Sequence, residues 1–323
     1  MRLCFPDSRV TFVSSMKRVP TRACLAVWGM QPLPARAPPG LRIMRLEDGF
    51  LRSVGLGSEL TQPLSWVVDG RGIYYDASRS SDLEALLSTA EFPAALVARA
   101  RALRQQVVGA HLTKYNVGKD EWRRPATRGR LILVPGQVES DASLAYGAPG
   151  IRHNMDLLQA VRAANPGACV IYKPHPDVTA RLRAAGAEEH LAARWCDAVA
   201  SDVSMSCLLE AVDEVHVMTS LAGFEALLRH KPVTCYGQPF FSGWGLTTDV
   251  LPLARRTRML ALDELVAGAL ILYPHYFSRS SAARLSPEQA VDQLLAWKVG
   301  NGSATPWWRV LLRVLLRRTV GVH

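Results

Sequence analysis

The sequence contains no long uninterrupted apolar stretch. Its apolar runs are broken by Gly and Pro, and none reaches the ~18 residues that a membrane-spanning helix needs. Residues 1–20 include basic side chains but no apolar core of the kind that signal peptides have. We therefore expect a cytoplasmic protein that does not cross the membrane.

Common cysteine and nucleotide-binding motifs are absent as well. The six cysteines are scattered without CxxC or CxxH spacing, which is typical of free thiols in a reducing compartment. No GxGxxG follows a predicted strand, and no GxxxxGK[ST] occurs. These absences weigh against a zinc site, a disulfide framework, nicotinamide binding and P-loop chemistry.

Basic residues are in excess. The chain has 38 Lys and Arg against 28 Asp and Glu, a formal net charge of +10. Such a balance favours anionic partners, namely nucleic acid, anionic lipid or a negatively charged substrate. The same excess also fits a surface of solvated arginines, so charge alone leaves these alternatives open.

Apolar segments alternate with helical patterns in the first half of the chain. The expected strands are residues 24–28, 41–44, 66–68 and 73–75. Helical periodicity then covers residues 81–107, with Ser81 as the N-cap. Residues 114–129 are polar and charged, and we expect the domain boundary there.

The second half restarts the alternation. Its expected strands are residues 131–134, 168–173, 215–218 and 233–236, and its clearest helices are residues 154–164 and 221–229. Strand–helix alternation indicates a parallel sheet with helices on both faces. The predicted fold is therefore α/β, with two Rossmann-like domains, residues 1–128 and 129–300, facing a cleft.

Polar side chains cluster where the predicted strands end. The clusters are Glu47 with Asp48 and Gly49; Gln137, Glu139, Asp141 and Ser143; Lys173 with His175; and Thr219 with Ser220. Open parallel sheets bind ligands at the carboxyl ends of their strands. The clusters supply carboxylates, a cationic pair and a helix N-terminus, which attracts phosphate.

Each cluster also has an ordinary structural explanation. Glu47, Asp48 and Asp141 could all be ordinary acidic residues of turns. His175 lies between two prolines and suits a rigid loop, and Ser220 suits a plain N-cap. The functional interpretation depends on their convergence at one sheet edge. That convergence indicates a substrate with a phosphate leaving group and a reacting carbon that needs an acid, a base or a nucleophile.

Seven ordered motifs resemble one family. They are residues 45–53 (RLEDGFLRS), 72–77 (GIYYDA), 113–116 (TKYN), 134–143 (VPGQVESDAS), 172–178 (YKPHPDV), 219–227 (TSLAGFEAL) and 237–247 (GQPFFSGWGLT). Over about residues 23–276 the chain resembles the capsule polysaccharide β-Kdo transferases of the KpsC type. Members of that family commonly carry two transferase modules in tandem. This chain has the length of one and is more similar to the second.

The resemblance implies a GT-B-like fold and a retaining glycosyltransferase. The enzyme would move the acidic sugar Kdo from CMP-Kdo, in β linkage, to a Kdo acceptor linked to (lyso)phosphatidylglycerol. It would build the poly-Kdo linker of capsular polysaccharide for biosynthesis and export. Residues 1–128 would form the acceptor side and residues 129–300 the CMP-sugar side.

The resemblance also implies roles for individual residues. Asp141 matches the family's candidate nucleophile, and Glu47 and Asp48 lie where the acid/base would be. His175 and Ser220 would contact the CMP phosphate. The other implied substrate-binding residues are Gln137, Lys173, Pro176, Thr219 and Glu225.

Neither a metal nor another cofactor is expected. Retention needs two inversions, so a carboxylate should form a covalent sugar ester. His175, Lys173 and the helix end at Ser220 could stabilise the single phosphate of CMP without a divalent ion. No Asp-x-Asp motif occurs.

Two rival functions remain. The first is another GT-B enzyme with a different donor, such as a CMP-sialic acid transferase or a UDP-sugar enzyme. The second is an inactive module that docks capsule enzymes at the membrane, which the joint presence of Asp141, Glu47 and His175 disfavours.

The last residues, 301–323, form a basic amphipathic pattern. Arg309, Arg313 and Arg317 recur every fourth residue, opposite Trp, Leu and Val. This composition indicates a helix lying in the plane of an anionic leaflet, although a helix packed on the protein's own core would look similar. We expect a peripheral protein on the cytoplasmic face of the inner membrane. Its partners would be CMP-Kdo, a glycolipid and other capsule synthesis and export proteins, but no nucleic acid.

Overall fold

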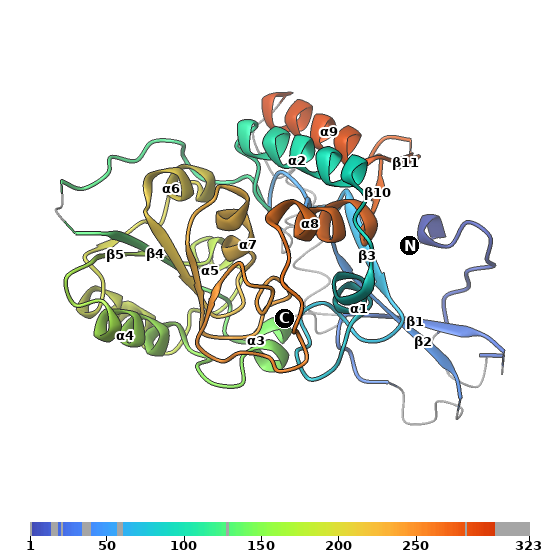
Figure 1. The fold of residues 1–323 in the computed structure, drawn as a ribbon, viewed down its shortest axis with the longest axis horizontal. Helices are drawn as coiled ribbons and strands as arrows, with labels where there is room; N and C mark the ends of the chain where they lie inside the picture. Colours follow the sequence, from blue (N-terminus) through green and yellow to red (C-terminus); the bar gives the residue numbers. More distant parts are fainter. Residues whose placement is uncertain are drawn as a thin grey trace.

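The computed structural model describes residues 2–13, 19–20, 22–33, 40–56, 61–126, 129–281 and 283–300. Within these ranges the strands form two sheets, set beside each other and accompanied by helices (Figure 1). The strand order is β1-β2-β3-β10-β11 in the first sheet and β6-β5-β4-β7-β8-β9 in the second. The α/β prediction is confirmed.

The second sheet is parallel throughout, as expected. Its strands are β4 (Leu131–Pro135), β5 (Cys169–Lys173), β6 (Ala198–Val199), β7 (Glu214–Val217), β8 (Val233–Cys235) and β9 (Thr248–Asp249). The helical elements between them are α3 (Ala142–Gly147), α4 (Asn154–Ala164), α5 (Pro176–Thr179), η4 (Glu189–Arg194), α6 (Met205–Ala211) and α7 (Leu221–Leu228). Connections of this kind place helices on both faces of a parallel sheet.

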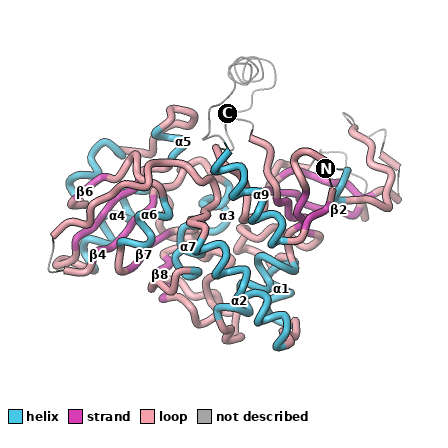
Figure 2. Tube along the Cα trace, turned by 90° about the horizontal axis from the view of Figure 1, so that it is seen from above, coloured by secondary structure: helices cyan, strands magenta, loops and turns pink. Residues whose placement is uncertain are grey.

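Strand β4 shows how the second sheet is covered on both faces. Leu131 and Leu133 belong to the core that includes residues of α6 and α7. Ile132 and Val134 belong to the core that includes residues of α4. Successive side chains of a strand point to opposite faces, so a continuous apolar run can fill two cores at once. Figure 2 shows α4 and α6 beside this sheet.

The first sheet is mixed rather than parallel, which corrects the expectation of a second sheet of the same kind. Its strands are β1 (Cys24–Trp28), β2 (Arg42–Asp48), β3 (Ser65–Asp69), β10 (His275–Phe277) and β11 (Arg284–Leu285). Only β1 and β2 run parallel; the other neighbours are antiparallel. Glu47 and Asp48 were expected after this strand, but they are the last two residues of β2.

The strand predicted at residues 73–75 is wrong. Asp69 ends β3, and its Oδ1 accepts the N–H groups of Arg71 and Gly72 at 3.0 and 2.7 Å. A further backbone bond runs from the N–H of Asp76 to the carbonyl of Ile73, at 3.0 Å. These contacts fold the segment into turns, so apolar residues there did not signal a strand.

The single helix predicted over residues 81–107 is two helices, α1 (Asp82–Thr89) and α2 (Ala94–Gly109). Pro93 separates them, because proline disfavours helical backbone at the preceding residue and lacks an N–H. The predicted cap is confirmed: Ser81 Oγ accepts the N–H of Glu84 at 3.0 Å. A short 3₁₀ turn, η1 (Arg2–Cys4), precedes the first sheet.

The chain returns to the first sheet after residue 260. The returning elements are α8 (Leu262–Val266), the π-helical turn η5 (Ala267–Leu272), β10, β11 and α9 (Pro287–Gly300). Figure 1 shows α9 beside α2, with α8 below them. Strand pairing therefore does not follow the predicted division at residue 128, because β10 pairs with β3.

Two ion pairs join this returning segment to the first half of the chain. Arg104 Nε lies 2.8 Å from Asp263 Oδ1, and both side chains are nearly buried. Arg256 Nη2 lies 2.9 Å from Glu84 Oε2, also in the interior. Breaking one member of a buried pair leaves an uncompensated charge, so these contacts hold the two parts of the chain in a fixed relation.

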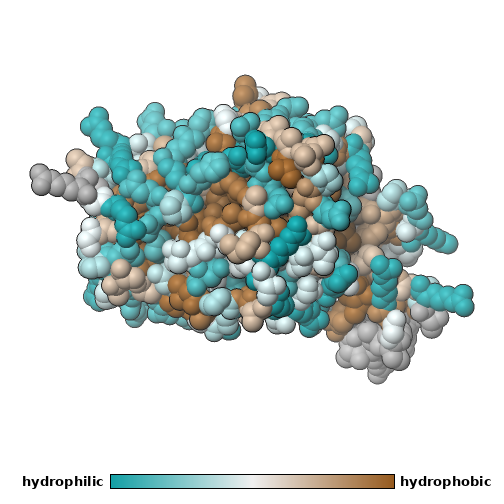
Figure 3. All heavy atoms as spheres, viewed as in Figure 1, coloured by the Kyte–Doolittle hydropathy of each residue, from teal (hydrophilic) through white to brown (hydrophobic). Residues whose placement is uncertain are grey.

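The surface is hydrophilic over most of the face in Figure 3, with apolar side chains reaching it near the middle. Among the helices of the described ranges, none is long and apolar enough to cross a bilayer. The predicted amphipathic helix lies outside the described residues.

Candidate active site

A pocket of about 610 Å³ opens where both halves of the chain meet. From the first half it is lined by Tyr74, Tyr75 and the connector at residues 113–119. From the second half it is lined by the residues that follow β4, β5 and β7. Eight predicted site residues line it: Gln137, Asp141, Lys173, His175, Pro176, Thr219, Ser220 and Glu225. The convergence predicted for the strand-end clusters is therefore observed for seven residues: Gln137, Asp141, Ser143, Lys173, His175, Thr219 and Ser220.

Gln137 joins the end of β4 to the start of α7. Its Nε2 donates to Thr219 Oγ1 at 2.9 Å, and its Oε1 accepts the N–H of Thr219 at 2.9 Å. The backbone of Gln137 is fixed in turn by the amide of Asn154. A side chain engaged at both ends positions the pocket wall, so Gln137 shapes the site more than it contacts a ligand.

The glycine before Gln137 is required by close packing. A Cβ at Gly136 would lie 2.4 Å from the hydroxyl of Tyr172. That separation is far below van der Waals contact, so any side chain would have to displace the buried ring of Tyr172 or the loop. The VPGQ sequence thus places a glycine against Tyr172 and, next to it, the glutamine that is hydrogen-bonded to Thr219.

Helix α7 begins at the pocket. Ser220 caps it, and its Oγ accepts the N–H of Ala222 at 3.3 Å. Free N–H groups at a helix start carry partial positive charge and bind anions. One turn further, Glu225 is buried and accepts the N–H of Lys114 at 2.7 Å. Burial raises the pKa of Glu225 to about 7.

His175 is neutral, which corrects the expectation of a cationic pair. Burial lowers its pKa to about 4, against the opposing influence of Asp141. Its Nδ1 accepts the N–H of Asp177 at 3.1 Å, capping α5. The remaining proton therefore sits on Nε2, which leaves one N–H available as a donor in the pocket.

Lys173 is committed to the protein itself. Its Nζ donates to the carbonyl of Val203 at 2.5 Å, and the carbonyl of Ala200 lies 3.5 Å away. Burial lowers the pKa of Lys173 to about 8. The ammonium thus adds positive charge at the pocket wall while it holds the loop after β6.

Asp141 presents an open carboxylate. It occupies the N-cap position of α3, but its side chain makes no capping bond. The side chain is 51% exposed, and Arg183 Nη2 approaches its Oδ1 at 3.5 Å. Glu139, in the same motif, instead accepts the N–H groups of Asn154 and Ala187 at 2.9 Å each. Of these two acids, only Asp141 lines the pocket.

Glu47 and Asp48 are not among the residues that line the pocket, although Lys114 and Tyr75, which contacts Glu47, are. Burial raises the pKa of Glu47 to about 7, and the charges of Asp48 and Asp141 add to the effect. Its Oε2 accepts a long hydrogen bond of 3.4 Å from the Tyr75 hydroxyl. Asp48 is ion-paired with Arg52. Glu47 is therefore the acid of this pair that is tuned to exchange a proton near neutral pH.

Three residues in the site received no role from sequence reasoning. Lys114 and Tyr115 line the pocket from the connector, and Arg183 meets Asp141. The TKYN motif contained the first two, yet it fell in a segment that looked like a polar linker. Within the described residues no group of three His, Cys, Asp or Glu side chains could hold a metal ion.

The paired α/β units with a pocket between them define a protein of GT-B-like architecture, and comparison with known proteins refines this class. The family model for capsule polysaccharide biosynthesis proteins matches residues 34–276. The chain therefore belongs to the capsule polysaccharide biosynthesis protein family.

Two solved structures are similar to this chain. One is the β-Kdo 2,7 transferase of Thermosulfurimonas dismutans KpsC, with a TM-score of 0.71, 42% identity and coverage of 86% of each chain. The other is the β-Kdo 2,4 transferase of the same KpsC, with a TM-score of 0.75, 34% identity and coverage of 84% of this chain and 86% of that one.

Curated relatives agree with the family. The capsule polysaccharide modification protein LipA of Neisseria meningitidis serogroup A is 48% identical over 256 residues, which are 79% of this chain and 36% of LipA. The lipopolysaccharide-processing protein LpsZ of Rhizobium meliloti is 42% identical, over 92% of this chain and 71% of LpsZ. The chain thus spans about a third of the length of LipA.

Proposed function

We propose that this protein is a retaining β-Kdo transferase that uses CMP-Kdo as donor and a Kdo-terminated glycolipid as acceptor. The observation that carries the proposal is one pocket that gathers an open carboxylate, Asp141, with a helix N-terminus and a neutral imidazole donor. The two similar solved structures are Kdo transferases, which supports this donor sugar.

The CMP phosphate would lie at the start of α7. The hydroxyl proton of Ser220 and the N–H of Leu221, the first residue of that helix, would bind its oxygens, and His175 would donate from Nε2. Lys173, which lines the pocket, would add positive charge. Neither a metal nor another cofactor has a role in this proposal, since these groups can hold the phosphate as it leaves.

The reaction would proceed in two displacements. In the first, a carboxylate oxygen of Asp141 attacks the anomeric carbon of Kdo, the bond from that carbon to the phosphate oxygen breaks, and CMP leaves with the electron pair. In the second, the acceptor hydroxyl attacks the same carbon, its proton passes to Glu47, and Asp141 leaves as a carboxylate. Two inversions give net retention.

The direct test is incubation with CMP-Kdo and a synthetic Kdo-terminated glycolipid. Mass spectrometry should show one added Kdo, and NMR should show a β linkage. Activity should be unchanged in EDTA. No transfer, or protection of the protein by UMP better than by CMP, would favour an enzyme with another donor. Loss of turnover in EDTA that magnesium restores would contradict the metal-free mechanism.

Replacing His175 with asparagine should weaken CMP binding about tenfold or more. Asparagine can still cap α5 through its amide oxygen, but its amide would not reach the position of the imidazole Nε2–H. Loss of a charge-assisted hydrogen bond costs about 1.5–3 kcal/mol. Calorimetric titration with CMP measures the effect, and His190→Asn, an exposed histidine outside the pocket, is the matched control. Equal affinity in both variants would place the phosphate elsewhere.

We also propose that residues 301–323 hold the enzyme on the inner leaflet. Each arginine near an anionic surface contributes about 1 kcal/mol, and the apolar face adds burial in the acyl boundary. Deleting residues 307–323 should therefore release the protein from vesicles that contain phosphatidylglycerol.

Vesicle co-sedimentation tests this anchor, with neutral phosphatidylcholine vesicles as the control. The truncated enzyme should keep its activity on a short soluble acceptor, because all pocket residues precede residue 249. Its activity on an acceptor embedded in lipid should fall. Equal sedimentation of both forms would show that the tail does not anchor the protein.

A further inference from the structure

Lys114 is held in the pocket by its backbone. Its N–H donates to Glu225 Oε1 at 2.7 Å, and its carbonyl accepts the N–H of Ser53 at 3.2 Å. Asn116 has a φ of 53° and turns the loop back. Its side-chain amide accepts the N–H of Thr113 and donates to the carbonyl of Thr113, at 2.8 Å each. The connector thus presents the Lys114 side chain at a fixed place.

The ammonium of Lys114 has no ion-pair partner within 4.0 Å in the part of the chain that the structure describes. It lies 5.3 Å from the centre of the Tyr115 ring. Burial works against its charge, but Tyr115, Asp48 and Glu47 together raise the pKa of Lys114 above its ordinary value. Lys114 is therefore charged at neutral pH, half-buried, and at the border of the cavity.

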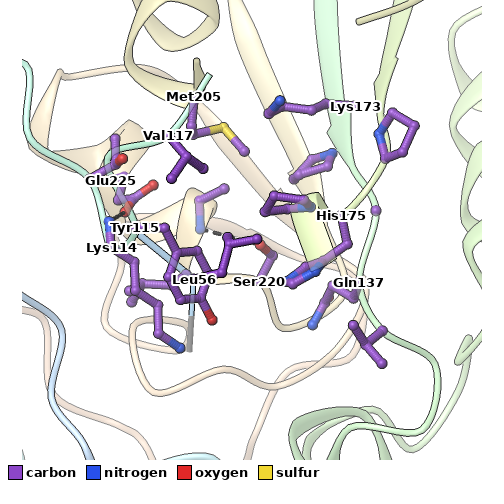
Figure 4. A pocket seen from close by; sticks show the side chains of 18 of the residues that line it. Leu56, Lys114, Tyr115, Val117, Gln137, Lys173, His175, Met205, Ser220 and Glu225 are labelled. Carbon is purple, nitrogen blue, oxygen red and sulfur yellow. Dashed lines mark hydrogen bonds between the residues drawn. The ribbon is translucent and has the colours of Figure 1, made fainter. Parts of the chain in front are cut away.

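Three of the other cations near the pocket are already engaged, while Lys119, which also lines it, is exposed. Lys173 donates to backbone carbonyls, Arg183 faces Asp141, and Arg52 is paired with Asp48. In Figure 4, Lys114 lies with Tyr115 and Glu225 on one side of the pocket, while Lys173 and His175 lie on the other. A ligand phosphate beside His175 would leave Lys114 facing a different part of the ligand.

An acidic sugar creates an electrostatic problem that a neutral sugar does not. Its carboxylate is bonded to the anomeric carbon that Asp141 would attack, so it must approach within a few ångströms of Asp141. Glu47 and Asp48 add two more acids close by. Like charges at such distances in a partly buried site repel strongly. A cation placed on that side is needed to offset the repulsion.

We propose that Lys114 binds the carboxylate of the donor sugar and so selects sugar acids over neutral sugars. This inference rests on the proposed function and adds a residue that recognises the substrate class. Tyr115, which packs edge-on against His175 with ring centres 6.1 Å apart, would form the wall between the carboxylate and the phosphate.

The test compares Lys114→Met, which keeps the length without the charge, with Lys114→Arg, which keeps the charge. Lys298→Met is the matched control, because Lys298 donates to the carbonyl of His111 at the surface and lies outside the pocket. The first measurement is the rate of Kdo–enzyme adduct formation from CMP-Kdo without acceptor, followed by intact mass. The second is the dissociation constant of CMP.

Lys114→Met should slow adduct formation at subsaturating CMP-Kdo by about tenfold or more, with CMP affinity within about twofold of the wild type. Lys114→Arg should recover part of the rate, and Lys298→Met all of it. A third probe is inhibition by 2-deoxy-Kdo and by its methyl ester. The wild type should prefer the acid, and Lys114→Met should bind both alike.

Each other outcome overturns the inference in a distinct way. Equal loss of CMP affinity in Lys114→Met would place the phosphate at Lys114. Normal adduct formation with a raised KM for acceptor would place the acceptor's carboxylate there. If the wild type forms neither adduct nor product from CMP-Kdo, the proposed function fails, whereas an active wild type with an unaffected Lys114→Met removes only the role of Lys114.

Discussion

Asp141→Ala should reduce Kdo transfer by roughly 10⁴-fold or more, because a retaining double displacement loses its nucleophile. The fold should survive. Asp141 makes no side-chain capping bond to α3, and its carboxylate is half exposed, so little native contact is removed. CMP affinity should also persist, since the predicted phosphate contacts come from α7 and His175.

Intact-mass spectrometry makes this expectation specific. Wild-type protein mixed with CMP-Kdo should gain the mass of one Kdo residue, and peptide mapping should place it on Asp141. Asp141→Ala should show no adduct. Asp156→Ala, at an exposed aspartate in the first turn of α4, should behave as the wild type. Transfer at a normal rate by Asp141→Ala would exclude Asp141 as the nucleophile.

Glu47→Gln should slow transfer by about 10²–10⁴-fold, the usual contribution of a general base. The loss should fall on the second displacement alone, because the phosphate of CMP needs no protonation by Glu47 to leave. The adduct on Asp141 should therefore form normally and accumulate in the presence of acceptor. A variant that blocked adduct formation instead would show that Glu47 serves the first step.

The pH dependence follows from the burial of Glu47. Its pKa is raised to about 7, and a general base acts in its deprotonated form. Breakdown of the wild-type adduct should speed up as pH rises through about 7 and level off above it. In Glu47→Gln this rise of the breakdown rate with pH should be absent. A rate that falls through pH 7 would indicate a general acid.

Stability offers a second readout for the same carboxyl group. An acid whose pKa is raised in the folded state holds its proton more tightly there than in the unfolded chain. Its stabilising contribution is complete below pH 4.5 and is lost as pH rises to about 7. Glu47→Gln should lose this share of the pH dependence. Thermal melting of both proteins across that range measures it, independently of any substrate.

Much of the parallel sheet could be predicted because its strands are continuous apolar runs. The strands expected at residues 131–134, 168–173 and 215–218 correspond to β4, β5 and β7. The side chains of β4 and β5 fill cores on both faces, so their apolar signal is strong, whereas His216 interrupts the apolar run of β7. The short strands β6, β9, β10 and β11 carry no comparable signal, since two or three residues are too few to show a period.

The first sheet was harder to predict because its pairing is not local. β10 lies about two hundred residues after β3 in the chain, and only the folded protein brings them together. The GIYYDA segment looked like a strand by composition, yet the carboxylate of Asp69 turns it. In such places tertiary contacts outweigh local propensity.

The sequence by itself determined the α/β class and the polar residues after the strands that meet at the pocket, because the carboxyl ends of parallel strands share one edge. Only the tertiary structure decided what those residues can do. Burial makes His175 neutral and brings the pKa of Glu47 to about 7, and Arg52 engages Asp48 while Asp141 stays open. Protonation and availability depend on solvent exposure and on partners distant in the chain, and neither property can be read from the order of residues.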